Sequence, residues 1–118
     1  MENKEFSKLL GNRTKKFALS IIKLSVSLPN TPESRVIKNQ ITKSGTSVGA
    51  NYREANRSRS KADFKNKIKI CESEASETVY WIELIENMNW ITDERLKSVL
   101  TEANEILAIF TSISNKLK

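Results

Sequence analysis

Hydrophobic residues recur in steps of three and four along nearly the whole chain, the spacing that places side chains on one face of an α-helix. The pattern divides into four segments, with short breaks at residues 28–31, 56–60 and 89–92. None of the segments shows the strict alternation of a half-buried strand. The clearest stripe, in the third segment, has the a/d spacing of helices packed side by side and consists of Phe64, Ile68, Cys71, Ala75, Thr78, Ile82 and Ile85.

The other three segments carry comparable stripes. In the first, the polar Arg13 interrupts an apolar line that consists of Phe6, Leu10, Phe17, Ile21, Leu24 and Leu28. The second stripe consists of Ile37, Ile41, Ser44, Val48, Tyr52 and Ala55. The fourth consists of Leu96, Val99, Leu100, Ala103, Ile106, Leu107, Phe110, Ile113 and Leu117. Because each stripe must be buried against another element, four amphipathic helices of about 25 residues are predicted.

Three of these helices have recognisable start signals. Thr31 is predicted to be the N-cap of the second helix, with Pro32 at the first helical position, where a missing N–H does no harm. Ser60, with Asp63 three residues later, resembles a capping box at the start of the third. The fourth helix is predicted to open at Thr92, with the two acids that follow in its first turn.

Short connections between four such helices favour an antiparallel, up-down-up-down four-helix bundle with a left-handed twist. Three glycines and two prolines are too few turn residues for a sandwich or barrel of many short strands. A chain of 118 residues fits one domain. We therefore predict an all-α fold in which residues 1–118 form a single four-helix bundle domain.

A run of small residues at 44–50, in the middle of the second predicted helix, contains Gly45 and Gly49. It is not a phosphate-binding loop, because no strand precedes it and no Gly-Lys-Ser/Thr ending follows. Each glycine costs a helix about 1 kcal/mol relative to alanine. Close approach of a neighbouring helix is the expected compensation.

The third predicted helix carries more apolar surface than its stripe needs. The additional residues are Tyr80, Trp81, Leu84, Met88 and, just beyond the helix, Trp90. An oligomer interface formed by Tyr80, Trp81, Leu84 and Met88 would bury this surface. The alternative is that these large side chains close the end of the bundle.

The net charge of +6 is unevenly distributed. Residues 1–61 contain thirteen basic and four acidic residues, and residues 62–118 contain seven basic and ten acidic ones. The densest basic cluster surrounds the break between the second and third helices and consists of Arg53, Arg57, Arg59, Lys61, Lys65, Lys67 and Lys69. Such a cluster attracts the phosphate backbone of nucleic acid. The alternatives are a solvated surface and pairing with acidic residues of another subunit.

Chemistry that an enzyme would need is missing from the sequence. No histidine is present, which removes the commonest general base and metal ligand. Cys71 stands alone in the third stripe and is expected to be a buried, inert thiol. Glu74, at the edge of the same stripe, is expected to pair with Arg53 across two helices. We therefore expect no catalytic activity, no metal site and no cofactor.

No segment predicts export or insertion into a membrane. Residues 1–13 mix charged with apolar side chains, unlike the apolar core of a signal peptide. The most apolar stretch, residues 18–28, contains Lys23 and is far shorter than the roughly 20 residues of a membrane span. The expected location is the cytoplasm.

Several stretches of the sequence resemble one bacterial protein family. They are "SLP" at 27–29, "RVI" at 35–37, "SGTSVGANYREA" at 44–55, "RSKADF" at 59–64 and "ESEASETVYWIELI" at 72–85. They are similar to the 23S rRNA intervening sequence proteins, four-helix bundles whose genes lie within insertions in large-subunit ribosomal RNA genes. A related branch serves the reverse transcriptase of diversity-generating retroelements and resembles a pentameric ring with a basic surface that binds nucleic acid.

The resemblance implies a homo-oligomer, favours a pentamer, and implies nucleic acid and a reverse transcriptase as partners. It marks Tyr52, Arg53 and Glu54 as motif residues and Arg57 and Arg59 as a basic turn.

Two hypotheses about the function follow. In the first, the protein self-associates and binds RNA or DNA without reading base sequence, through Arg53, Arg57, Arg59, Lys61 and Lys65. In the second, it is a homo-oligomeric interaction scaffold with no nucleic-acid contact.

Overall fold

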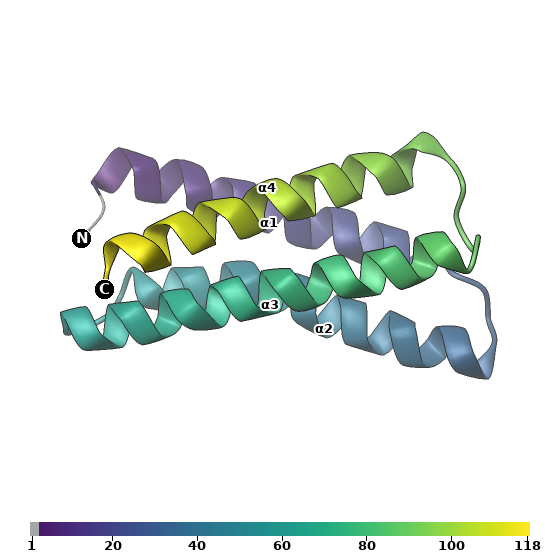
Figure 1. Cartoon of the computed structure of the whole chain (residues 1–118), viewed down its shortest axis with the longest axis horizontal. Helices are drawn as coiled ribbons and strands as arrows, with labels where there is room; N and C mark the ends of the chain where they lie inside the picture. Colours follow the sequence, from purple (N-terminus) through teal and green to yellow (C-terminus); the bar gives the residue numbers. More distant parts are fainter. Residues whose placement is uncertain (1–2) are drawn as a thin grey trace.

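The computed structural model describes residues 3–118, which form four helices and no strand (Figure 1). The helices are α1 (Lys4–Val26), α2 (Pro32–Ala55), α3 (Lys61–Asn87) and α4 (Glu94–Lys116). Consecutive helices run in opposite directions, so both ends of the described chain and the α2–α3 turn lie at one end of the molecule (Figure 1). The predicted all-α fold is confirmed, whereas the left-handed twist stays a prediction. Met1 and Glu2, which belong to the segment tested for a signal peptide, lie outside the described residues.

The four helices form a bundle in which each helix contacts two neighbours. Helix α2 packs on α1 and α3, and α3 packs on α4, while α1 and α4 meet along a looser seam. Within residues 3–118, no Cα atom of α1 comes within 8 Å of α3, and none of α2 comes within 8 Å of α4. The apolar side chains of all four helices therefore meet along one central axis. The longest dimension of the molecule is 44 Å.

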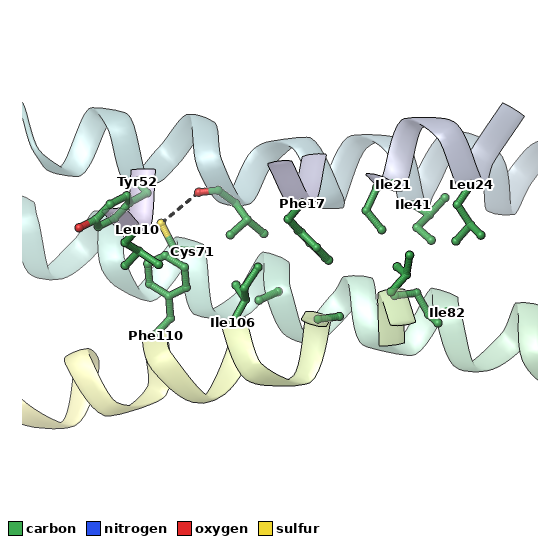
Figure 2. Packing of buried hydrophobic residues seen from close by; sticks show 14 of the residues in the cluster. Leu10, Phe17, Ile21, Leu24, Ile41, Tyr52, Cys71, Ile82, Ile106 and Phe110 are labelled. Carbon is green, nitrogen blue, oxygen red and sulfur yellow. Dashed lines mark hydrogen bonds between the residues drawn. The ribbon is translucent and has the colours of Figure 1, made fainter. Parts of the chain in front are cut away.

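The core is made mainly of the predicted stripes. The predicted positions that are only partly buried and pack against its edge are Ile37, Leu100, Leu107, Ile113 and Leu117. All seven predicted positions of α3 are buried, and Tyr52 of α2 meets Phe110 of α4 edge to face with ring centroids 5.5 Å apart (Figure 2). Cys71 is fully buried, as expected, and its Sγ atom lies 3.5 Å from the Val48 carbonyl oxygen (Figure 2).

The stripe of α1 differs from the prediction at two positions. Thr14, and not Arg13, fills the gap between Leu10 and Phe17, since Thr14 is fully buried. Its hydroxyl donates to the carbonyl oxygens of Leu10 and Gly11 at 3.0 Å, so the helix itself satisfies the buried polar atom. Phe6, which lies in the first turn of α1, is 39% exposed.

Two of the predicted helix starts are confirmed. The Thr31 side chain accepts a hydrogen bond from the backbone N–H of Ser34, and Pro32 is the first residue of α2. The Ser60 hydroxyl accepts from the backbone N–H of Asp63 at 3.0 Å. Because these caps satisfy otherwise unpaired N–H groups, they fix where the chain turns into each helix.

The predicted start of α4 is wrong by two residues. The helix begins at Glu94, and Asp93 is its N-cap, with the carboxylate accepting from the backbone N–H of Arg95 at 3.0 Å. Aspartate is among the residues most favoured at the N-cap, so the helix starts directly after Asp93, and Thr92 and Asp93, which were expected inside the helix, precede it.

The small-residue run of α2 brings neighbouring helices close together, as predicted. A Cβ atom added to Gly45 would lie 2.7 Å from Cγ2 of Ile21 on α1. A Cβ atom added to Gly49 would lie 3.2 Å from the hydroxyl of Thr14. On the other side of α2, the hydroxyl of Thr78 donates to that of Ser44 at 2.8 Å. These contacts fix the register of α2 against both of its neighbours.

Candidate nucleic-acid interface

The predicted basic cluster lies around the turn between α2 and α3. Arg57 and Arg59 belong to the turn, and Lys61 is the first residue of α3. All three side chains are exposed, as is that of Arg53 in the last turn of α2. Since both ends of the described chain lie at the same end of the bundle, Lys4 and Lys116 join this region (Figure 1).

The structure does not bring Lys65 together with Arg53. Lys65 is half-buried on α3, one helical turn before Lys69. Lys69 lines a shallow groove with Leu107 and Ser114 of α4, so this flank of α3 faces α4. Helix α4 has no contact with α2 within the described residues. The five predicted residues are therefore divided between two faces of the bundle.

The bases of the turn are not neutralised by acids. In residues 3–118, ion pairs join only Arg13, Arg95 and Lys97 to carboxylates. Among the described residues, no ion pair includes Arg53, Arg57, Arg59, Lys61 or Lys65. An array of exposed, unpaired cations attracts polyanions, and guanidinium groups can bind phosphate oxygens through two parallel hydrogen bonds.

Arg13, in contrast, is engaged inside the protein. Its Nε and Nη2 atoms donate to the two carboxylate oxygens of Glu102 at 2.8 and 2.7 Å, and Nη2 also lies 2.7 Å from Glu105. Hydrogen bonds to these glutamates raise the pKa of Arg13. This clamp ties α1 to α4 across their loose seam. Sequence analysis missed it, although a basic residue inside an apolar stripe was a signal that Arg13 needs an acidic partner.

The expected pair between Glu74 and Arg53 is wrong. Glu74 lies beside Ser47 and Lys43 of α2 and beside Glu77 on its own helix. In the α2–α3 register, Ser44 bonds to Thr78 and Val48 to Cys71, which places Arg53 more than one helical turn away from Glu74. Burial, and a hydrogen bond that the protonated Glu74 carboxyl donates to Glu77, raise the pKa of Glu74.

The predicted oligomer interface is partly exposed. Tyr80 is 53% and Met88 56% exposed, whereas Trp81 and Leu84 are half-buried. The rings of Tyr80 and Trp81 meet edge to face at 5.1 Å. The indole N–H of Trp81 is buried and has no acceptor among the described residues. Trp90, the fifth residue of this group, packs against the core and so helps to close the bundle.

Sequence analysis missed a second group of exposed apolar side chains. On α1 these are Leu19, Ile22 and Val26, which are 50%, 41% and 74% exposed. They lie at three- and four-residue steps outside the core stripe, a spacing that could have identified a second apolar line.

No helix within residues 3–118 combines the length and hydrophobicity needed to cross a membrane. No cluster of potential metal ligands occurs in the same range.

Comparison with known proteins places this bundle in a family. The family model for the 23S rRNA-intervening sequence protein matches residues 10–112, which include all of α2 and α3 and all but the start of α1 and the end of α4. The chain belongs to this family. A crystal structure of a protein of unknown function from the S23 ribosomal protein family of Bacteroides thetaiotaomicron VPI-5482 is 40% identical, with a TM-score of 0.81. The match covers 88% of this chain and 96% of that one. Among curated proteins, no match is found.

Membership in the 23S rRNA-intervening sequence family confirms the resemblance that the sequence motifs suggested. Of the three residues that the resemblance marks as motif residues, Tyr52 is fully buried in the core, whereas Arg53 and Glu54 are exposed beside it. The motif thus combines a core position with two surface charges on the last turn of α2.

Proposed function

We propose that the protein is a non-enzymatic, self-associating bundle that binds the phosphate backbone of RNA or DNA without reading base sequence. The observation that carries this proposal is the set of exposed bases at the α2–α3 turn, none of which is paired with an acid in residues 3–118. The family name refers to ribosomal RNA, so a structured RNA is the first ligand to test.

The test compares two variants that lose the same charge at opposite ends of the bundle. Arg57→Glu/Arg59→Glu removes two bases from the turn, and Arg95→Glu/Lys97→Glu removes two bases from the start of α4. Binding to a 20-base-pair RNA hairpin and to duplex DNA is measured by fluorescence anisotropy at several salt concentrations. Each lost phosphate contact lowers affinity about eightfold at 0.1 M salt, so the turn variant is expected to bind at least about 60-fold more weakly.

The control variant is expected to bind like the wild-type protein, because its bases lie at the other end of the bundle (Figure 1). Equal losses in both variants would contradict a localised site and leave only net charge as the cause. Absence of binding by the wild-type protein at 50 mM salt would overturn the proposal.

The alternative function is a homo-oligomeric scaffold, and the unpaired indole of Trp81 beside the exposed Tyr80 favours it. A partner subunit could supply both an acceptor for the indole N–H and a cover for the phenol ring. The expected assembly is a pentamer. Sedimentation of wild-type protein and of Tyr80→Glu/Met88→Glu tests this, because acids at a buried interface would dissociate the oligomer. An unchanged sedimentation coefficient would exclude this face.

A further inference from the structure

The close packing of α1 and α2 determines which of their outer residues lie side by side. Three contacts fix the register: Ser25 with Thr42, Ile21 with Gly45, and Thr14 with Gly49. The two helices run in opposite directions (Figure 1), so each further step along α2 moves one step back along α1. From the last of these contacts, Arg53 lies level with Leu10 and Arg57 level with Phe6. Lys8 of α1 is therefore at a height between the two arginines.

The orientation of these side chains follows from the same contacts. On α1, Arg13 faces α4 and Thr14 faces α2. Since each residue turns the helix by about 100°, Lys15 points to the outer flank beside α2. Lys8 lies two turns earlier on the same line, and Lys4 one turn before Lys8.

Helix α2 presents its two arginines to this same outer flank. Gly49 faces α1, and Arg53 follows it by four residues on the same side of α2. Arg57 continues this line just beyond the helix end. We name the five side chains that line this flank the α1–α2 basic strip: Lys4, Lys8, Lys15, Arg53 and Arg57.

No base of the strip is paired with an acid within residues 3–118. All five side chains are exposed, and none forms an ion pair in that range. The acids that are nearest in sequence, Glu5 and Glu54, precede Lys8 and Arg57 by three residues, a spacing at which side chains can meet, but neither of them forms an ion pair with these bases. The three lysines of α1 and the two arginines at the end of α2, which are far apart in the sequence, thus form one line of positive charge on the surface.

We propose that the α1–α2 basic strip is a track for the sugar-phosphate backbone of duplex nucleic acid, which lies along the bundle instead of touching only the α2–α3 turn. This inference rests on the proposed function and adds Lys4, Lys8 and Lys15 to the residues that contact nucleic acid. The distance from Lys4 to Lys15 along α1 is about 16 Å. One strand of a duplex rises about 3.4 Å along the duplex axis per phosphate, so the strip matches an axial length that contains about five phosphates of each strand.

The chain offers a matched control for this proposal on the same helix. Lys8→Gln/Lys15→Gln removes two charges from the strip, and Lys16→Gln/Lys23→Gln removes two charges with the same seven-residue spacing. All four lysines are exposed and unpaired in residues 3–118, but Lys16 lines the groove between α1 and α4. The two pairs of lysines thus have the same charge and spacing and differ in the side of α1 that they face. Circular dichroism and sedimentation verify that both variants fold and assemble like the wild-type protein.

Binding to a 20-base-pair DNA duplex and to an RNA duplex of the same length is measured across a salt series. For DNA, Lys8→Gln/Lys15→Gln is expected to reduce the slope of log K against log salt by about 1.8 and to weaken binding about 60-fold at 0.1 M salt. The Lys16→Gln/Lys23→Gln variant is expected to change the slope by less than about 0.5. Comparison of the two duplexes shows whether the track prefers RNA or DNA.

Equal effects of the two lysine pairs would overturn the track. If the strip variant then still bound like the wild type while Arg57→Glu/Arg59→Glu did not, the proposed function would stand and the turn alone would be the site. No binding by the wild-type protein overturns both. Anionic phosphatidylserine vesicles serve as a further probe, and binding to them without binding to either duplex would identify a membrane surface as the partner and contradict the track.

Discussion

The close approach of α1 and α2 predicts that alanine at Gly45 destabilises the protein although alanine favours a helix. The new Cβ atom would lie 2.7, 2.8 and 3.0 Å from Cγ2, Cγ1 and Cβ of Ile21, which is fully buried. Rotation of the Ile21 side chain cannot move its Cβ atom, so the two helices must separate. Overpacking of this kind costs about 2–3 kcal/mol. The better helix propensity of alanine returns about 1 kcal/mol, which leaves a net loss of about 1–2 kcal/mol.

Gly11 provides the matched control, because it also lies inside a helix but a Cβ atom added there would meet nothing within 4 Å. Gly11→Ala is therefore expected to stabilise the protein by about 0.5–1 kcal/mol. Urea unfolding followed by circular dichroism measures both changes at a fixed protein concentration. Thermal midpoints should move in opposite directions, by roughly 4 °C per kcal/mol. If Gly45→Ala stabilised the protein as much as Gly11→Ala does, the close contact with Ile21 would be refuted.

Three further predictions concern polar contacts. Arg13→Gln should cost about 1 kcal/mol in urea unfolding, and 1 M NaCl should reduce this loss because the clamp is half-exposed; a salt-independent loss would contradict an ionic role. Glu77→Gln should stabilise the protein at pH 7, because burial and the neighbouring Glu77 raise the pKa of Glu74 in the folded state, so the native protein loses stability as pH rises through that value, and the substitution removes the part due to Glu77. This gain should disappear well below the ordinary pKa of a glutamate, where Glu74 is protonated in the folded and the unfolded state, and a pH-independent gain would refute the coupling. Thr78→Val should cost about 1–2 kcal/mol because it leaves the buried Ser44 hydroxyl without its 2.8 Å partner, and unchanged urea unfolding would show that this bond contributes nothing.

The fold could be predicted from the sequence because local and long-range signals agree. The a/d spacing of α3 identified all seven of its buried positions. Caps at Thr31 and Ser60 fixed two helix starts through side-chain chemistry that depends only on neighbouring residues. At α4 two adjacent residues could cap the helix, and periodicity alone could not decide between them.

The surface could be predicted only in part, since it depends on register and rotation about each helix axis. The basic cluster was visible as a run in the sequence, but its division between the α1 and α4 sides of the bundle was not. Lys8 and Lys15 lie about forty residues from Arg53, and only the contacts of Gly45 and Gly49 bring them to the same flank. The clamp at Arg13 required knowledge that α1 and α4 are neighbours.

The most direct test of the central claim, that exposed bases of this bundle hold a phosphate backbone, is the salt dependence of wild-type binding to duplex DNA. At least five phosphate contacts per protomer, one for each base of the α1–α2 basic strip, predict a slope of log K against log salt of about −4.5 or steeper. A slope near zero, or no binding at 50 mM salt, would contradict the claim and leave the scaffold function as the explanation of this bundle.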